Sequence, residues 1–306
     1  MKVALLGDLH LRNTVPKSRK ETYVEEMWKK MRYISAFCED EDVKLILQPG
    51  DFFHTAKQPL EVLIPTAQLL KQTDQFVTKI QWLTVLGNHD MAFHQKNSPY
   101  ISVNLLAKAG LVKIADEKPI NFYDADNEHH VFVYGTSYGD SIPELVNEEG
   151  IHILLIHAMI IKDKKIWEQQ DKFLYSQHLL KRNKFDLIVA GDNHNFFTDM
   201  YRGRFLVNCG SLMRSNIDQQ DHKPCFFIYD TSAKSLTKQL LPCKEDVFIH
   251  ETKQEKQDDF QDLFSSMIKN NQEDISIDFR KNVEMYMEVK GIPEPVKKLI
   301  KEIVYV

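Results

Sequence analysis

Asp, Asn and His side chains follow five apolar, strand-like segments of the sequence, each at the point where the segment ends. The five groups are Asp8-x-His10, Asp51-x-x-His54, Asn88-His89-Asp90, His157 and Asp192-x-His194. Four of the groups have a glycine at or near the turn. Because ligands of open α/β sheets bind outside the carboxyl ends of the strands, we expect all five groups to meet at one edge of the fold.

Side chains of these types are ligands for divalent metal ions. Carboxylates favour Mn²⁺ and Mg²⁺, whereas imidazoles favour Zn²⁺, Fe²⁺ and Mn²⁺. The seven candidate ligands are Asp8, His10, Asp51, Asn88, His157, Asp192 and His194. They are too many for one tetrahedral zinc ion and fit two ions that share a bridging carboxylate, about 3.5–4 Å apart. Such a pair activates water and neutralises the charge of a phosphoryl group under attack.

Turn formation and packing are the alternative explanation for these residues. A Gly-Asp pair after a strand is commonly a turn, and a single strand-end histidine such as His157 is commonly structural. The run Gly87-Asn88-His89-Asp90 fits that explanation poorly, since three adjacent polar groups directly after a buried strand contribute little to packing. The presence of all five groups in one chain favours the metal site.

The sequence pattern predicts an α/β fold in which a two-layered β sandwich is flanked by helices. Eight short runs of apolar or β-branched residues are the predicted strands: Val3–Gly7, Val43–Gln48, Gln81–Leu86, His130–Tyr134, Ile151–Ile156, Asp186–Ala190, Arg204–Asn208 and Cys225–Tyr229. Several are almost entirely apolar, which is typical of strands covered on both faces. Helical patterns alternate with the early strands, and the later half is richer in strands, which predicts a mixed sheet.

Three helices are predicted between these strands. Residues 23–38 carry an apolar stripe at spacings of three and four, and Ser18 and Glu21 have the spacing of a capping box that would start this helix. A second helix is predicted through the sixties and seventies. A third is predicted from Ser98-Pro99 to Gly110, with proline just inside the start and glycine just past the end.

The character of the sequence changes near residue 245. We therefore expect residues 1–244 to form one domain and residues 245–306 to form a small α+β appendage, too short to fold easily alone. Its pattern comprises a charged stretch, a helical stripe at residues 260–268 and two alternating, strand-like segments.

Composition and charge exclude several classes of protein. The 306 residues are 43% hydrophobic and 27% charged, which is ordinary for a globular protein. No apolar stretch approaches the roughly 18 residues of a membrane span, and we expect a cytoplasmic or nucleoid-associated protein. The four cysteines lack C-x-x-C spacing, which argues against a zinc ribbon or a disulfide framework. With a formal charge of −5, any contact with nucleic acid should be local, through a patch or a bound metal.

The order of the motifs resembles that of the calcineurin-like metallophosphoesterases. These motifs are Asp-x-His, Gly-Asp-x-x-His, Gly-Asn-His-Asp, a strand-end histidine and Gly-x-x-His, and they span residues 8–214. Residues 50–54 and 208–214 resemble motifs of the SbcD-type branch, the nuclease partners of an SMC-like ATPase in DNA end processing, although Cys209 stands where a proline is common. The resemblance implies a four-layer α/β/β/α sandwich. It extends only weakly to a small C-terminal α+β cap.

The resemblance also implies a role for each site residue. One metal would be held by Asp8, His10, Asp51 and His194, and the other by Asp51, Asn88, His157 and Asp192, with Asp51 bridging. His89 would act on the scissile phosphate or the leaving oxygen, which needs a proton near neutral pH. His54 would steady the phosphate charge from the opposite flank, and Asp90 would orient His89 or its loop.

One position departs from the family pattern. The last motif is usually Gly-His-x-His, and here it reads Gly191-Asp192-Asn193-His194. Asp192 can still be a ligand, and its added negative charge favours Mn²⁺ or Mg²⁺ over softer metals. Two divalent ions are therefore expected, with Mn²⁺ preferred and Mg²⁺ or Fe²⁺ as alternatives. The other interpretation is that the second metal is weak or absent.

These features predict a Mn²⁺-dependent DNA exo/endonuclease of the SbcD type. Arg12 and Arg214 flank the first and last motifs and are candidate contacts with DNA phosphates, with solvated surface charges as the alternative. An SbcC-type ATPase partner and a homodimer are implied by the resemblance alone. Two other functions remain open: hydrolysis of a cyclic nucleotide, phosphomonoester or phosphoprotein, and a non-catalytic scaffold that lost its second metal through Asp192.

Overall fold

The computed structural model of the chain describes most of its first 249 residues. The described residues are 1–74, 79–92, 95, 96, 98, 101–146, 149–163, 173–245, 247–249, 287, 294, 297 and 298. No helix among them is long and apolar enough to cross a membrane.

Two six-stranded sheets form the centre of the fold. The first has the strand order β14-β13-β1-β2-β3-β4 and the second the order β11-β12-β10-β7-β6-β5. Their strands are β1 Lys2–Leu5, β2 Val43–Gln48, β3 Gln81–Thr84, β4 Lys113–Ile114, β5 Ile120–Asp124, β6 His129–Thr136, β7 Ile151–His157, β10 Leu187–Gly191, β11 Phe197–Tyr201, β12 Arg204–Asn208, β13 Cys225–Asp230 and β14 Ser235–Leu240. A separate pair consists of β8 Ile160–Ile161 and β9 Leu174–Tyr175. All eight predicted strands are present.

Both sheets are mixed, as predicted. In the first sheet β1, β2, β3 and β4 run parallel, and β13 and β14 pair antiparallel beside them. In the second sheet β6, β7, β10 and β12 run parallel, and the edge strands β5 and β11 are antiparallel to their neighbours. The parallel strands bring the carboxyl ends of β1, β2 and β3 to one rim, and those of β7 and β10 to the corresponding rim of the other sheet.

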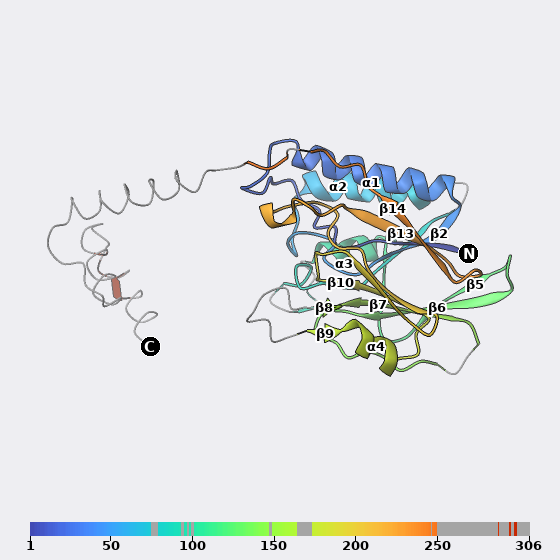
Figure 1. Cartoon of the computed structure of the whole chain (residues 1–306). Coiled ribbons are helices and arrows are strands. Elements are labelled where there is room, and N and C mark those ends of the chain that lie inside the picture. The colour runs from blue at the N-terminus through green and yellow to red at the C-terminus, as the bar shows by residue number, and fades with distance from the viewer. Residues whose placement is uncertain are drawn as a thin grey trace. The chain divides into compact units, whose positions relative to one another are not determined.

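Helices cover the outer face of each sheet (Figure 1). The helices α1 Tyr23–Asp40, α2 Leu60–Asp74 and α3 Ser102–Lys108 share a hydrophobic core with the first sheet, and α4 Ser176–Arg182 shares one with the second. Between the sheets, Leu45 and Leu47 of β2 belong to the same buried cluster as Ile153 and Leu155 of β7, while Ile46 faces the helices. The result is the predicted four-layer α/β/β/α sandwich.

Two predicted helix starts are wrong. The helix α1 begins at Tyr23 with Thr22 at its N-cap, so Ser18 lies too far before the helix to cap it, and its hydroxyl instead donates to the backbone oxygen of Ser215 (3.0 Å). The helix α3 begins at Ser102, after a turn in which the Ile101 amide donates to the Ser98 carbonyl oxygen (3.3 Å). Its end agrees with the prediction, since Gly110 follows it at a φ of 74°.

The first compact unit runs from Met1 to Ile249, beyond the predicted boundary at residue 244. The segment up to Ile249 belongs to it because the Lys20 amide donates to Val247 O (3.1 Å) and the Ile249 amide donates to Ser18 O (3.0 Å). The second unit is His250–Val306. Almost all of it lies outside the described residues, so its predicted α+β organisation stays a prediction.

Candidate metal centre

Asp51 lies between two groups of polar side chains that come from both sheets. Its Oδ2 atom is 3.5 Å from Nε2 of His10, which follows β1 in the first sheet. Its Oδ1 atom is 3.5 Å from Nε2 of His157, which ends β7 in the second sheet. The two oxygens of one carboxylate therefore face two different imidazoles, which is the arrangement that a bridging ligand requires.

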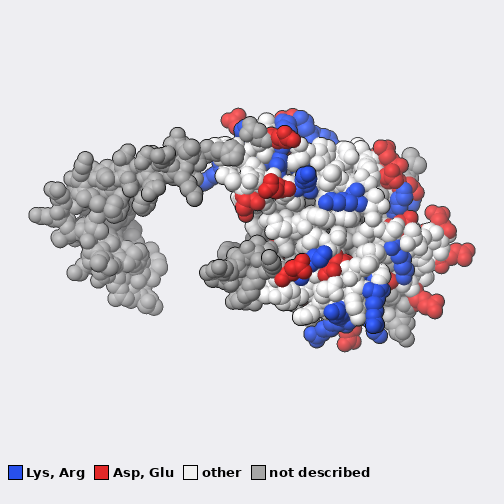
Figure 2. All heavy atoms as spheres, in the orientation of Figure 1, with Lys and Arg blue, Asp and Glu red and all other residues white. Residues whose placement is uncertain are grey.

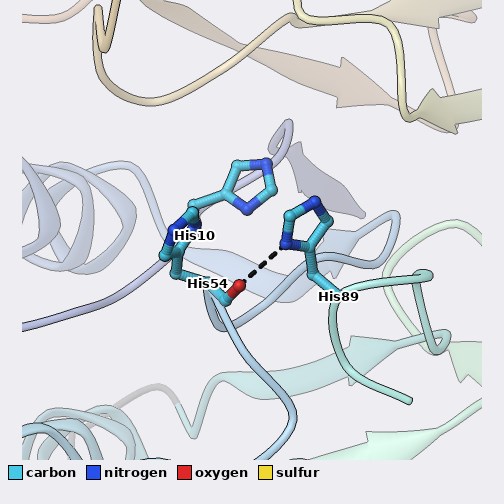
Figure 3. Close-up of side chains that lie close together, drawn as sticks. All are labelled: His10, His54 and His89. Carbon is cyan, nitrogen blue, oxygen red and sulfur yellow. Dashed lines mark hydrogen bonds between the residues drawn. The ribbon is translucent and has the colours of Figure 1, made fainter. Parts of the chain in front are cut away.

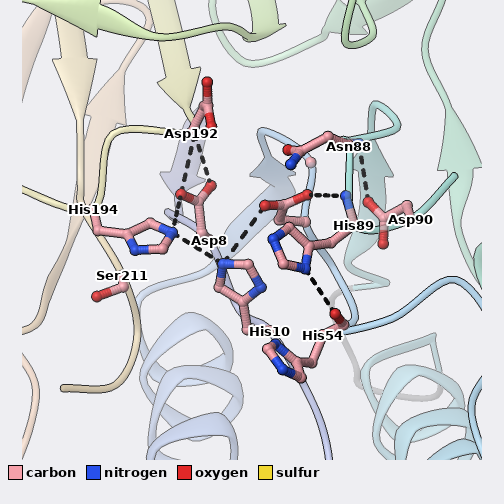
Figure 4. Close-up of polar contacts among 12 residues, drawn as sticks. Asp8, His10, His54, Asn88, His89, Asp90, Asp192, His194 and Ser211 are labelled. Carbon is pink, nitrogen blue, oxygen red and sulfur yellow. Dashed lines mark hydrogen bonds and ion pairs between the residues drawn. The ribbon is translucent and has the colours of Figure 1, made fainter. Parts of the chain in front are cut away.

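Asp8, His10 and His194 lie together (Figure 4), and with Asp51, which is next to His10, they form the first group. Ligand atoms of Asp8, His10 and His194 all lie within 4.8 Å of one another. His194 Nε2 is 3.6 Å from Asp8 Oδ2 and 3.0 Å from His10 Nε2. This group contains the four residues that the resemblance assigns to one metal.

The second group is built around His157. Its Nδ1 atom is 2.7 Å from the backbone oxygen of Pro49, which can only accept a hydrogen bond. Nδ1 therefore carries the ring proton and donates a hydrogen bond to Pro49 O. The unprotonated Nε2 atom then faces Asn88 Oδ1 at 3.0 Å and Asp51 Oδ1 at 3.5 Å. Three lone pairs that point at one another repel unless a cation lies among them. The donor set of this group therefore fits a divalent ion.

Asp192, the residue that departs from the family pattern, lies at the junction of the two groups. Its backbone amide donates to the carboxylate of Asp8 (3.1 Å to Oδ2). Its negative charge acts on His157, where it opposes the effect of burial on the pKa of the imidazole. These contacts place the backbone of Asp192 beside Asp8, and its role as a ligand of the second metal stays a prediction.

Burial shifts the pKa values of these groups toward their neutral forms. Burial and the neighbouring Asp51 raise the pKa of Asp8 well above its usual range, and burial raises the pKa of Asp51 to about 6. Burial lowers the pKa of His10 well below its usual value and that of His194 to about 4. A divalent cation would lower the pKa values of the carboxylates again and favour their charged forms, because it is the largest local charge at such a site.

Three of the predicted ligands have a left-handed backbone, with φ values of 46° at His10, 52° at Asp51 and 83° at Asp192. This conformation is uncommon outside glycine, and such strain clusters at functional sites. Neighbouring contacts hold the strained residues in place, including the His10 amide, which donates to Asp51 O at 2.9 Å. The strain turns ligand side chains from successive loops toward a common point.

Glycines in the motifs provide room for the ligands. A Cβ atom at Gly87 would lie 2.1 Å from Asp51 Oδ1, and one at Gly191 would lie 2.6 Å from Asp8 Oδ1. Neither glycine has a positive φ, so space, rather than backbone freedom, requires them. The glycines that precede the polar groups are therefore part of the site's packing.

His89 is held on one flank of the site by the backbone of His54 (Figure 3). Its Nδ1 atom is 2.7 Å from the carbonyl oxygen of His54, and the centroids of the two rings are 5.5 Å apart. His10 is also close, with its ring centroid 4.7 Å from that of His89. Burial, and then the charge of Arg12, lower the pKa of His54 to about 4. The two predicted catalytic histidines thus lie together beside the first group.

Asp90 holds the loop that carries Asp51. Its carboxylate accepts the amides of Phe52 (3.1 Å), Phe53 (3.0 Å) and Gly87 (3.0 Å). Burial and the Asp51 charge raise its pKa to about 7. The predicted role was to orient His89 or the loop of His89. The Gly87 contact lies in that loop, and the contacts with Phe52 and Phe53 lie in the loop of Asp51.

The two arginines predicted to contact DNA make contacts within the protein. Arg12 Nη2 donates to the hydroxyls of Tyr23 (3.2 Å) and Ser215 (3.3 Å). Arg214 donates to backbone oxygens of Gln220 and Lys244. Their contacts with DNA remain predictions.

Two supporting residues were missed by the sequence analysis. Gln48 ends β2, and its amide nitrogen donates to the backbone oxygens of Gly7 and Gly50, so it joins the first two motif loops. Asn208 ends β12 and donates to the backbone oxygens of Asn193 and Asn195, each at 2.7 Å. A polar residue at the end of a buried strand was the available signal in both cases.

Residues 1–196 of the chain match the calcineurin-like phosphoesterase family. The chain belongs to this family. Membership confirms the predicted fold and the predicted class of reaction, metal-dependent hydrolysis of a phosphoester. The family binds two divalent metal ions, and the two oxygens of Asp51 face two imidazoles, His10 and His157.

Individual proteins similar to the chain are distant from it. The DNA double-strand break repair protein Mre11 of Halobacterium salinarum is 22% identical over 220 residues, which are 69% of this chain and 53% of that protein. The chain thus spans about half the length of this relative. A dimetal phosphatase from Danio rerio is 11% identical, with a TM-score of 0.48 over 81% of this chain and 98% of that one. GAP50, the anchor in the inner membrane complex of Plasmodium, is 13% identical, with a TM-score of 0.43 over 83% of this chain and 90% of that one.

Proposed function

We propose that the chain is a Mn²⁺-dependent DNA nuclease that hydrolyses phosphodiester bonds with two metal ions. The observation that carries the proposal is the position of Asp51, whose two oxygens face the imidazoles of His10 and His157. The proposed ligands are the seven residues of the two groups. Aspartate oxygens are prominent among them, which favours Mn²⁺ or Mg²⁺.

Two observations support DNA as the substrate. The first is the similarity to Mre11, a DNA double-strand break repair protein. The second is an opening at the edge of an otherwise buried site, where the His194 side chain is 42% exposed beside the buried Asp8. Enzymes for small molecules usually enclose their substrates in a pocket, whereas an open site can take a phosphodiester within a long chain.

The charge distribution favours local contacts with DNA. On the face seen in Figure 2, Lys and Arg side chains alternate with Asp and Glu. The formal net charge of −5 would repel a polyanion at long range. Binding would therefore depend on the metal centre and on cations next to it, and affinity would fall with added salt.

The chain's own residues would have distinct roles in hydrolysis. Two bound ions would supply an activated water molecule and neutralise phosphoryl charge. The Nδ1–H group of His89 donates a hydrogen bond to the His54 carbonyl oxygen. The Nε2 atom is therefore left to exchange a proton with the leaving oxygen. Asp90 joins the Asp51 loop to its own loop through the amides of Phe52, Phe53 and Gly87.

Digestion of end-labelled linear duplex DNA tests the proposal. The purified chain should release nucleotides or fragments in Mn²⁺ and none in chelator. Hydrolysis of bis(p-nitrophenyl) phosphate, run in parallel, shows whether the centre is active on any diester. Activity on that ester without DNA cleavage would contradict the DNA proposal and favour another phosphoester. Inactivity on both would favour the non-catalytic scaffold.

A further inference from the structure

Arg12 is a buried cation without a carboxylate partner. Only 9% of its surface is exposed, and among the described residues no aspartate or glutamate forms an ion pair with it. Its Nε atom is buried and has no hydrogen-bond partner in the described structure. Burying an unpaired charge is costly, so such a side chain normally has a counter-ion.

The charges around Arg12 do not supply that counter-ion. Glu26, which lies in the same region, pairs with Arg19 at 3.0 Å and with Lys244 at 3.6 Å. Arg19 in turn donates to the backbone oxygen of Arg214 at 2.5 Å. Among the described residues, the ion pairs of this region therefore leave Arg12 without a carboxylate partner.

Backbone contacts fix Arg12 beside the metal centre. The residue before it, Leu11, pairs with Phe53, and the His54 amide donates to Leu11 O at 3.1 Å. Arg12 therefore follows His10 by two residues and lies next to His54, whose pKa its charge helps to lower. The Tyr23 ring, 4.9 Å from the guanidinium carbon, and the Ser215 hydroxyl hold the side chain from the other side.

We propose that Arg12 binds the backbone phosphate next to the scissile one, on the His54 side of the metal centre. This inference rests on the proposed function, because it takes the substrate to be a polynucleotide. A guanidinium has five N–H donors in a planar fork that matches phosphate oxygens. The phosphate next to the scissile one would then be the counter-ion of Arg12, which the described residues of the protein do not provide. Arg12 would thereby distinguish a polynucleotide from an isolated diester.

Two substrates separate this role from a purely structural one. Bis(p-nitrophenyl) phosphate has a scissile diester but no neighbouring phosphate, whereas a single-stranded oligonucleotide has both. Arg12→Gln should lower kcat/KM on the oligonucleotide by roughly 10- to 100-fold, the range for losing a charged hydrogen bond. The factor by which Arg12→Gln lowers kcat/KM on bis(p-nitrophenyl) phosphate should be at least tenfold smaller. Arg12→Lys, which keeps the charge without the fork, should fall between wild type and Arg12→Gln.

Salt dependence supplies a readout that packing would not change. With Ca²⁺ replacing Mn²⁺, the slope of log K against log salt for oligonucleotide binding should become shallower by about 0.7 in Arg12→Gln, since one phosphate contact is lost. The matched control is Arg202→Gln, an exposed arginine in the turn between β11 and β12, at the end of β12 opposite the metal centre. Equal losses on both substrates with an unchanged slope would overturn the proposal and leave Arg12 a structural residue.

Failure of the DNA proposal would be recognised separately. In that case wild type would hydrolyse bis(p-nitrophenyl) phosphate but neither bind nor cut the oligonucleotide. The comparison would then use the p-nitrophenyl ester of thymidine 5′-phosphate with and without a 3′-phosphate. A higher kcat/KM on the ester with the 3′-phosphate, seen in wild type and absent in Arg12→Gln, would support the Arg12 site. An equal kcat/KM on the two esters in wild type would overturn it.

Discussion

The Nδ1 atom of His89 lies 2.7 Å from the backbone carbonyl oxygen of His54. A carbonyl oxygen can only accept a hydrogen bond, so this contact assigns the proton to Nδ1 and leaves Nε2 for the substrate. It also joins the second and third motifs, which are separated by more than thirty residues of sequence. The position of the proposed acid therefore depends on the loop that also carries Asp51.

Replacement of His89 should separate turnover from metal binding. In His89→Asn the amide nitrogen can still donate to the His54 carbonyl oxygen, but no group replaces Nε2. We expect kcat on a DNA oligonucleotide, whose alkoxide leaving group needs a proton, to fall by about 10²- to 10⁴-fold, the usual contribution of general acid catalysis. Calorimetric titration should show Mn²⁺ binding as in wild type. His130→Asn, an exposed residue near the start of β6, is the matched control; near wild-type turnover in His89→Asn would refute the assigned role.

Gly87→Ala tests whether the motif glycine makes room for the bridging ligand. The added Cβ would lie 2.1 Å from Asp51 Oδ1, so the carboxylate must move. We expect at least a tenfold loss of Mn²⁺ affinity and of turnover, in the range seen when groups that orient ligands are altered. Gly203→Asn is the control, because its surroundings are open and asparagine tolerates its φ of 75°. Unchanged metal affinity in Gly87→Ala would show that Asp51 does not bind metal in the observed position.

Asp192→Asn tests the residue that departs from the family pattern. Asparagine also tolerates the φ of 83°, so the change removes the charge with little effect on the backbone. We expect the weaker of the two Mn²⁺ sites to lose roughly 10- to 100-fold in affinity, comparable to losses at ligand-supporting positions. Asp163→Asn, at an exposed site, is the control. Identical titration curves for Asp192→Asn and wild type would show that the charge of Asp192 contributes nothing to metal binding.

The metal-free protein should lose stability as pH rises from about 6.5 to 8. Burial raises the pKa of Asp51 to about 6 and of Asp90 to about 7, above the unfolded value of about 3.9. The native state then binds more protons than the unfolded state, so the free energy of unfolding falls with pH. Five histidines whose pKa values burial lowers oppose this trend, and their effect fades only as the pH rises above the unfolded histidine value of about 6.5. They are His10, His54, His157, His194 and His222.

Mn²⁺ should reverse that loss, because its carboxylate ligands must be ionised. At 100 times its dissociation constant, the metal should raise Tm by roughly 5–10 °C at pH 8. The increase should be smaller at pH 6.5. Thermal unfolding in Mn²⁺ and in chelator at both pH values provides the measurement. An equal increase at both pH values would contradict the raised carboxylate pKa values.

The central strands could be predicted from the sequence, whereas the edge strands could not. The runs Val43–Gln48 and Ile151–Ile156 are apolar because both faces of β2 and β7 are covered. Of the six missed strands, β8 and β9 form the separate pair and β4, β5, β11 and β14 are the edges of the two large sheets. The edge strand β14 has the mixed, half-exposed sequence Ser235–Leu240. Edge strands carry polar residues, so their sequences resemble loops.

The candidate ligands could be predicted because they combine a residue type with a strand end, but their supporting contacts could not. Nothing in the spacing of Asp90 shows that it accepts three amides from two loops. The capping box at Ser18 was wrong because the helix begins at Tyr23, and the Ser18 hydroxyl instead donates to a distant residue, Ser215. Contacts between residues far apart in sequence decide these roles.

Counting bound Mn²⁺ tests the central claim, that Asp51 joins two ions, most directly. Equilibrium dialysis of the chain with Mn²⁺ should give two ions per chain, and electron paramagnetic resonance should show them magnetically coupled. Asp51→Asn should abolish the coupling. One ion per chain, or two uncoupled ions in wild type, would contradict a bridged centre and with it the two-metal mechanism proposed for this protein.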